Sequence, residues 1–147
     1  MSTFVVKREN ALPVAGQDFL TLISPTNRRL KVISATCGGQ GTSSAAQALV
    51  MSRSIAGATP GAPITPTEYE NNEQATPVFT TATTWVAQPT PDANGEILPF
   101  NAMGGGFRWA AIGGRLMEAR NAECISFRPP AGVTPQNMSL TVVVEEN

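Results

Sequence analysis

Apolar and polar residues alternate most regularly near the C-terminal end, over positions 138–146. There Met138, Leu140, Val142 and Val144 are separated by Ser139, Thr141, Val143 and Glu145. A period of two places the first set on one face of a strand, so this stretch predicts a strand with one buried face. Positions 123–128 show the same period, with Ile125 and Phe127 on one face.

A second strand is predicted at 115–120, directly before the one at 123–128. Asn121 and Ala122 lie between the two segments, and Asn tolerates the left-handed conformation that a tight turn needs. The pattern therefore predicts a β-hairpin. It is preceded by the glycine-punctuated aromatic segment 104–109.

Further strands are predicted at 17–24, 28–36, 78–86 and 96–100, where Pro99 favours an edge position. Positions 45–54 have residues that favour a helix, but they lie between two turn-like stretches, so we predict a strand there. Eight or nine strands joined by turns predict an all-β chain with little or no helix. We expect a single antiparallel β-sandwich domain over 1–147, with a jelly-roll-like architecture.

Three segments are predicted to be irregular. Positions 1–12, with Phe4, Val5 and Val6, fit either an edge strand or an N-terminal arm that reaches a neighbouring subunit. Positions 55–77 are rich in proline and predict a long loop with a short extended piece near Ile64. The glycine-rich positions 37–44 lack the lysine of a phosphate-binding loop and predict a turn or bulge.

Composition narrows the partners that the chain is suited to. Only 14% of residues are charged and the net charge is −1, so there is no electrostatic case for binding nucleic acid or an anionic membrane. A surface of small neutral residues suits packing against other proteins. The first residues do not resemble a signal peptide, and no stretch is apolar for the length of a membrane span. Cys37 and Cys124 are far apart and predict two free, partly buried thiols in a reducing compartment.

Candidate chemistry is sparse because the chain has no histidine. Triads that need an imidazole base and typical zinc sites are thereby disfavoured. Carboxylate-based hydrolysis would rely on Glu96, Glu118 or Glu123, and solvated strand ends are the simpler interpretation of these acids. A calcium site would have to be formed by Glu68, Glu70, Asn71, Asn72 and Glu73, which lack the usual ligand spacing. We therefore predict no catalytic residue, no metal ligand and no cofactor, and expect a protein that is not an enzyme.

Arg108 and Trp109 form a conspicuous pair after three glycines. Such a pair can stack on a sugar or anchor a protein interface. The alternative is that Trp109 fills the core side of a strand while Arg108 points outward. A carbohydrate-binding, lectin-like module would use Trp109, Trp85 or Tyr69 as an exposed stacking platform.

Taken as a whole, the chain resembles small bacteriophage virion proteins of the jelly-roll capsid decoration, or cement, type. The resemblance is carried by DFLTLISPTNRRLKVISA (18–35), SSAAQAL (43–49), ITP (64–66), GGFRW (105–109), ARNAECISFRPPAG (119–132) and MSLTVVVEE (138–146). Ala122 stands where the turn of such proteins commonly has glycine. Head fibres and tail or baseplate components use similar sandwiches.

The resemblance implies a structural protein that folds in the host cytoplasm and then sits on the capsid surface of a virion. It implies a homotrimer that binds the major capsid protein and stabilises the joints between capsid subunits. By analogy, Phe4, Val5 and Val6 would anchor the arm, and Arg108 and Trp109 are the other candidate partner-binding residues. Neither nucleic acid nor membrane is expected as a partner, whereas glycan binding by the loops remains open.

Overall fold

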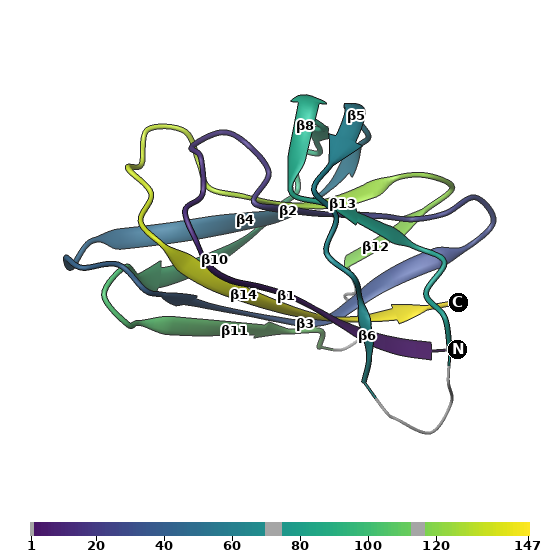
Figure 1. Cartoon of the computed structure of the whole chain (residues 1–147), viewed down its shortest axis with the longest axis horizontal. Coiled ribbons are helices and arrows are strands. Elements are labelled where there is room, and N and C mark those ends of the chain that lie inside the picture. Colours follow the sequence, from purple (N-terminus) through teal and green to yellow (C-terminus); the bar gives the residue numbers. More distant parts are fainter. Residues whose placement is uncertain (1, 70–74, 113–116) are drawn as a thin grey trace.

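The computed structural model describes residues 2–69, 75–112 and 117–147, and their regular structure is entirely β-strand. Two antiparallel sheets pack face to face, and Figure 1 shows them as a lower and an upper layer. The predicted all-β sandwich is therefore confirmed. Both chain ends lie at the same end of the sandwich (Figure 1).

Eight strands build the two layers in a jelly-roll order. In sheet A the order is β1-β14-β3-β11, and in sheet B it is β2-β13-β4-β10. The chain is thus one long antiparallel ribbon, in which β1 pairs with β14, β2 with β13, β3 with β11 and β4 with β10, rolled into two layers. The strands are β1 (Ser2–Ala11), β2 (Leu20–Ile23), β3 (Arg29–Gly39), β4 (Ala46–Ile55), β10 (Glu96–Asn101), β11 (Gly106–Ala110), β13 (Cys124–Arg128) and β14 (Met138–Glu146).

The core lies between the inner faces of the two sheets. On β14 the four apolar residues of even number are buried and their neighbours are only partly buried, so the predicted alternation is confirmed. Phe127 on β13 and Phe4 on β1 are fully buried within the same cluster. Burying large apolar side chains of this kind contributes about 1.5–3 kcal/mol each.

The predicted hairpin is wrong, although its strands and its turn are present. Asn121 and Ala122 both have positive φ, 54° and 67°, as a tight turn requires. However, β12 (Met117–Arg120) pairs with β3 in sheet A, while β13 pairs with β2 and β4 in sheet B. The turn therefore crosses from one layer to the other. Positions 115 and 116 of the predicted strand lie outside the described residues.

Residues 56–95, the β4–β10 connection, contain five short strands among the described residues. Two of them, β5 and β6, lie within 55–77, where a long loop was predicted. In the connection, β6 pairs with β1 and β7 pairs with β2, so the connection covers the same edge of both sheets. β5 and β8 pair with each other and project from the sandwich (Figure 1). An uncovered edge strand offers free hydrogen-bonding groups, and this cover satisfies some of them. The five strands are β5 (Ala58–Gly61), β6 (Thr67–Glu68), β7 (Thr80–Ala82), β8 (Thr84–Ala87) and β9 (Thr90–Pro91).

Several other predictions are settled by the strand bounds. The ambiguous stretch 45–54 is strand β4, and β10 with its Pro99 lies at the edge of sheet B, as predicted. The turn predicted at 37–44 begins later, because β3 runs on through Cys37 to Gly39. The stretch 78–86 is split into β7 and β8.

Candidate functional site

The N-terminal segment is a strand of the sandwich, so its interpretation as an arm is wrong. Phe4 and Val6 are fully buried, and Phe4 packs edge-on against Phe79 with 5.6 Å between the ring centroids. Val5 points to the outer face of sheet A, where it lies opposite Val143 and is partly buried. Alternation places every second residue in the core, so Phe4 and Val6 are not available to a partner.

Arg108 and Trp109 are divided between the two faces of β11. Arg108 lies opposite Thr36 and is exposed on the outer face of sheet A. Trp109 lies opposite buried Ala35 and packs against the edge of the core. The outward arginine and core-side tryptophan expected from strand parity are confirmed, and the two side chains do not form one contact surface.

The three aromatic residues of a carbohydrate platform do not lie together. Trp109 is on β11 and Tyr69 follows β6, which are opposite edges of sheet A. Trp85 is partly buried on β8, and its indole Nε1 donates a hydrogen bond of 2.9 Å to Thr21 Oγ1 in sheet B. A glycan platform needs aromatic faces exposed side by side, and these residues do not supply one.

Two of the candidate carboxylates are engaged close to the turn at Asn121. Glu118 Oε1 lies 3.7 Å from both Arg29 Nε and Arg120 Nε. Glu123 Oε2 accepts a hydrogen bond of 3.2 Å from the backbone N–H of Arg120. Glu96 begins the exposed edge strand β10. These three acids are solvated or paired residues at strand ends.

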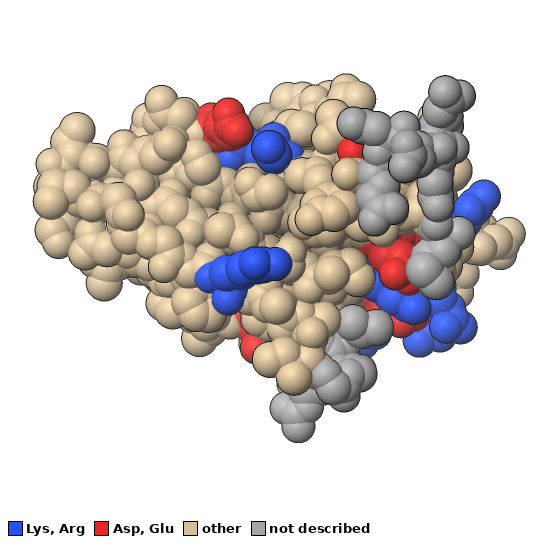
Figure 2. All heavy atoms as spheres, turned by 90° about the horizontal axis from the view of Figure 1, so that it is seen from below, with Lys and Arg blue, Asp and Glu red and all other residues tan. Residues whose placement is uncertain are grey.

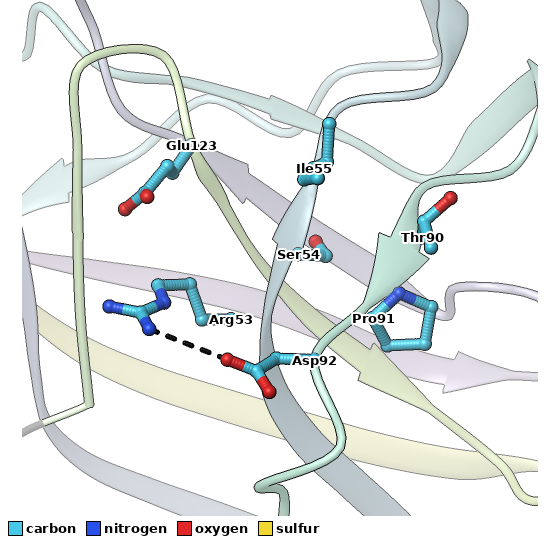
Figure 3. A pocket seen from close by; sticks show the side chains of 7 residues that line it. All are labelled: Arg53, Ser54, Ile55, Thr90, Pro91, Asp92 and Glu123. Carbon is cyan, nitrogen blue, oxygen red and sulfur yellow. Dashed lines mark hydrogen bonds and ion pairs between the residues drawn. The ribbon is translucent and has the colours of Figure 1, made fainter.

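Glu123 also lines a pocket of about 260 Å³ together with Arg53 and Asp92 (Figure 3). Arg53 Nη2 lies 3.4 Å from Asp92 Oδ2, and Glu123 is on the other side of the guanidinium. Arg53 and Asp92 are far apart in the chain, so no local sequence pattern indicated this pairing. Both members of the pair are substantially exposed, so it is a weak surface ion pair rather than an isolated reactive group.

Both cysteines are free and buried, as predicted. Burial raises the pKa of the Cys37 thiol to about 11. Burial, followed by the negative charges of Asp18 and Glu123, raises the pKa of the Cys124 thiol to about 11. Thiols with such pKa values are poor nucleophiles at neutral pH, because the thiolate is the reactive form.

Metal ligands do not gather in the described part of the chain, where no three Cys, Asp or Glu side chains are suitably placed for an ion. Of the calcium candidates, Glu68 accepts a hydrogen bond of 3.2 Å from the backbone N–H of Ala75. The other four, Glu70, Asn71, Asn72 and Glu73, lie outside the described residues.

The most distinctive surface is one end of the sandwich, which we call the neutral end. Four loops meet there: 12–17, 40–45, 102–105 and 129–137. None of them contains Asp, Glu, Lys or Arg. In Figure 2 the left part of the surface has no coloured side chain, and the charged residues gather toward the right. The signal was present in the sequence as the charge-free runs 32–52, 97–107 and 129–144.

Hydrogen bonds between neutral groups hold these four loops to one another. Backbone bonds link Gly41 to Ala102, Gln40 to Asn137 and Gly16 to Pro129, with N···O distances of 2.7, 2.8 and 3.1 Å. Side-chain amides add further links: Gln47 Nε2 donates to the carbonyl of Thr134 over 3.0 Å. A surface fixed in this way can bind a partner without first becoming ordered, which lowers the entropic cost of binding.

Apolar side chains are exposed on this rigid end. Leu12, Val14 and Met103 belong to its loops and are more than half exposed. Loops 12–17, 40–45 and 129–137 also enclose a shallow hollow of about 300 Å³, whose lining includes Leu12, Gly41 and Pro135. Exposed apolar residues on a charge-free, preformed surface are typical of a protein-binding site.

Comparison with known proteins gives no relative. No family model, no curated protein and no solved structure matches the chain. In the part of the chain that the structure describes, no helix has the length and apolar character needed to cross a membrane.

Proposed function

We propose that this chain is a non-enzymatic structural protein of a bacteriophage virion, a capsid decoration protein that acts as a homotrimer. The neutral end is the observation that carries the binding part of the proposal. It would pack against the major capsid protein and bury apolar and neutral polar surface across the joints between capsid subunits. The virion part rests on the resemblance of the sequence to proteins of the decoration type.

Several features favour contact with protein over other partners. Charged side chains are depleted at the centre of protein interfaces, and the four loops of the neutral end have none. A net charge of −1 gives no general attraction to nucleic acid or to an anionic lipid surface. A decoration protein that binds only the intact lattice stabilises it by mass action.

Light scattering across a tenfold dilution tests the trimer. The expected solution mass is three times the chain mass of 15.4 kDa, unchanged on dilution. A monomer at every concentration would remove the trimer from the proposal. The capsid contact is tested separately, by sedimentation with assembled capsid shells of the phage that encodes the chain.

Met103→Glu tests the surface itself, because it places a charge on an exposed apolar residue of the neutral end. We expect at least a tenfold loss of capsid affinity, since an unpaired charge at an interface core costs about 2 kcal/mol or more. Val86→Glu is the matched control: Val86 is also apolar and exposed, at 81%, but lies on the projecting β8. Equal loss for both variants, or binding that falls steeply with salt, would contradict an uncharged contact at this end.

A further inference from the structure

Arg8 is a cation near the end of β1 that is partly withdrawn from water. Its guanidinium lies over the ring of Phe19, with 4.3 Å from Cζ to the ring centroid. It also donates a hydrogen bond through Nη1 to the backbone carbonyl of Phe19. A guanidinium has five N–H donors, and within the described residues this is the one hydrogen bond that it makes.

No carboxylate of the described residues forms an ion pair with Arg8. Asp18 is close by, but its Oδ1 accepts from Arg128 Nε over 2.8 Å and its Oδ2 accepts from Thr21 Oγ1 over 2.6 Å. Burial lowers the pKa of the Arg8 guanidinium, which is the direction expected for a cation that is not offset by a nearby negative charge.

A pocket of about 160 Å³ lies against this cation. The loop 12–17 forms one wall, with Leu12, Pro13 and Val14, and the ring of Trp85 contributes to another. Gln17, Thr83 and Thr84 add polar groups to the lining. Asp18 also lines the pocket, with its carboxylate held by Arg128 and Thr21. The pocket thus combines a guanidinium that has free donors with a lining that is partly apolar and partly polar.

We propose that this pocket, the Arg8 pocket, binds a carboxylate carried on a short apolar stem. The carboxylate would accept hydrogen bonds from the free donors of Arg8, a pairing that is stronger than one between neutral groups. The stem would pack on the apolar walls. The same chemistry can come from a small organic acid or from the C-terminal carboxylate of a polypeptide. The inference does not depend on the capsid proposal.

The test follows the indole signal of Trp85 by NMR in a Trp109→Phe background, in which Trp85 is the remaining tryptophan. Propionate and a short peptide that ends in leucine with a free carboxylate are titrated at constant pH and ionic strength. The same peptide with an amidated C-terminus is the matched probe. We expect saturable shifts with propionate and with the free-carboxylate peptide. The amidated peptide should bind about tenfold more weakly than the free-carboxylate peptide, or more weakly still.

Variants locate the effect at Arg8. Arg8→Gln should lose about tenfold or more in affinity, and Arg8→Lys should lose less because it keeps the charge. Arg28→Gln, which removes an exposed arginine in a distant loop, should bind as the parent does. If Arg8→Gln does not fold, the free and amidated peptides still test the same point on the parent protein.

The outcomes separate the two sources of carboxylate. Binding of propionate without the peptide supports the site and assigns it to small organic acids. Tighter binding of the peptide than of propionate supports the site and assigns it to a polypeptide terminus. No saturable shift with either carboxylate, or equal affinity for the amide, would overturn the proposal.

Discussion

The neutral end and the β4–β10 connection both lie outside the eight main strands, but different interactions hold them in place. At the neutral end, neutral hydrogen bonds and close backbone contacts join the four loops. The β4–β10 connection is paired to the sheets through β6, β7 and β9, and it is further attached by two buried carboxylates. The carboxylate of Glu146 accepts hydrogen bonds from the backbone N–H groups of Val78 and Phe79, at 3.1 and 2.6 Å. The carboxylate of Asp18 accepts a hydrogen bond from Arg128, which in turn donates to a backbone carbonyl of the connection.

The second attachment is a chain of contacts across the outer face of sheet B. Asp18 bonds to Thr21, and Thr21 accepts from the indole of Trp85 on β8. Arg128 Nη2 donates to the carbonyl of Pro89 over 2.7 Å, and the side-chain oxygen of Gln88 accepts from the N–H of Asp18 over 2.9 Å. The Asp18 side chain is fully buried as a result.

The difference teaches how one fold serves two purposes. Many neutral bonds of about 1 kcal/mol each hold the neutral end without placing charge on its surface. Besides the paired strands β6, β7 and β9, a few charge-assisted bonds hold the connection, and each is stronger than a neutral bond and harder to replace. The end that is proposed to bind a partner is therefore the one whose internal structure does not depend on ions.

Asp18→Asn should have the largest effect, because it leaves the guanidinium of Arg128 without its negative partner. We expect a loss of about 3 kcal/mol in the free energy of unfolding, measured by urea denaturation. Asp92→Asn breaks the exposed pair with Arg53 and should cost about 1 kcal/mol or less. Similar losses for the two variants would mean that the buried pair does not hold the connection.

Gly39→Ala should have the next largest effect on stability, because the added methyl group would disrupt close backbone contacts at the neutral end. A Cβ at Gly39 would clash with the backbone oxygen of Asn101, so the ends of β3 and β10, from which loops 40–45 and 102–105 start, would have to separate. We expect a loss of about 1–3 kcal/mol by the same denaturation measurement. Gly38→Ala is the matched control, since its Cβ would have 3.7 Å to the nearest atom. An unchanged stability for Gly39→Ala would show that these loops are not tightly joined.

The two buried thiols should have a smaller effect, which is on the pH dependence of stability. Their folded pKa of about 11 lies above the ordinary 9.0, so the folded state holds the thiol protons more tightly. The stability that this gives is complete below about pH 9 and is lost as pH rises toward about 11. Measured between pH 8 and 11, the slope should be shallower in a variant with both cysteines changed to alanine. An equal slope would assign the pH dependence to other groups.

The smallest expected effect is a difference between the two cysteines in how salt changes their rate of alkylation. Negative charges of Asp18 and Glu123 contribute to the raised pKa of Cys124, whereas burial is what raises that of Cys37. Ions screen charges but not burial. High salt at pH 9.5 should therefore speed alkylation of Cys124 slightly and leave Cys37 unchanged, as mass spectrometry of the labelled peptides would show. If salt accelerated the alkylation of both cysteines equally, the proposed difference in what raises their pKa values would be wrong.

Much of the architecture was predictable because strands have a fixed period. The alternation at 138–146, the turn at Asn121 and the edge position of Pro99 all appear as expected. The pairing of β12 and β13 was not predictable, because a tight turn can close a hairpin or cross between layers. The prediction of an N-terminal arm was wrong for a related reason. A short apolar segment does not indicate whether it pairs with a strand of its own chain, as β1 does with β14, or with a strand of another subunit.

The candidate sites divide in the same way. The absence of charge in 32–52, 97–107 and 129–144 is visible in the sequence, but only the fold brings the loops within these runs, 40–45, 102–105 and 129–137, together at one end. Arg108 and Trp109 are adjacent in the chain and yet face opposite sides of β11. Asp18 and Arg128 are distant in the chain and form the shortest ion pair of the described residues, at 2.8 Å.

By itself, the sequence determined the class of fold, the strand faces and the lack of an imidazole, because these depend on residue type and local period. The tertiary structure alone decided which strands pair, that residues 2–11 belong to the sandwich and that the β4–β10 connection covers one edge of both sheets. It also placed Arg8, which forms no ion pair with a carboxylate of the described residues, beside a pocket. Such contacts join residues far apart in the chain, and their energies depend on burial and distance, which no local pattern contains.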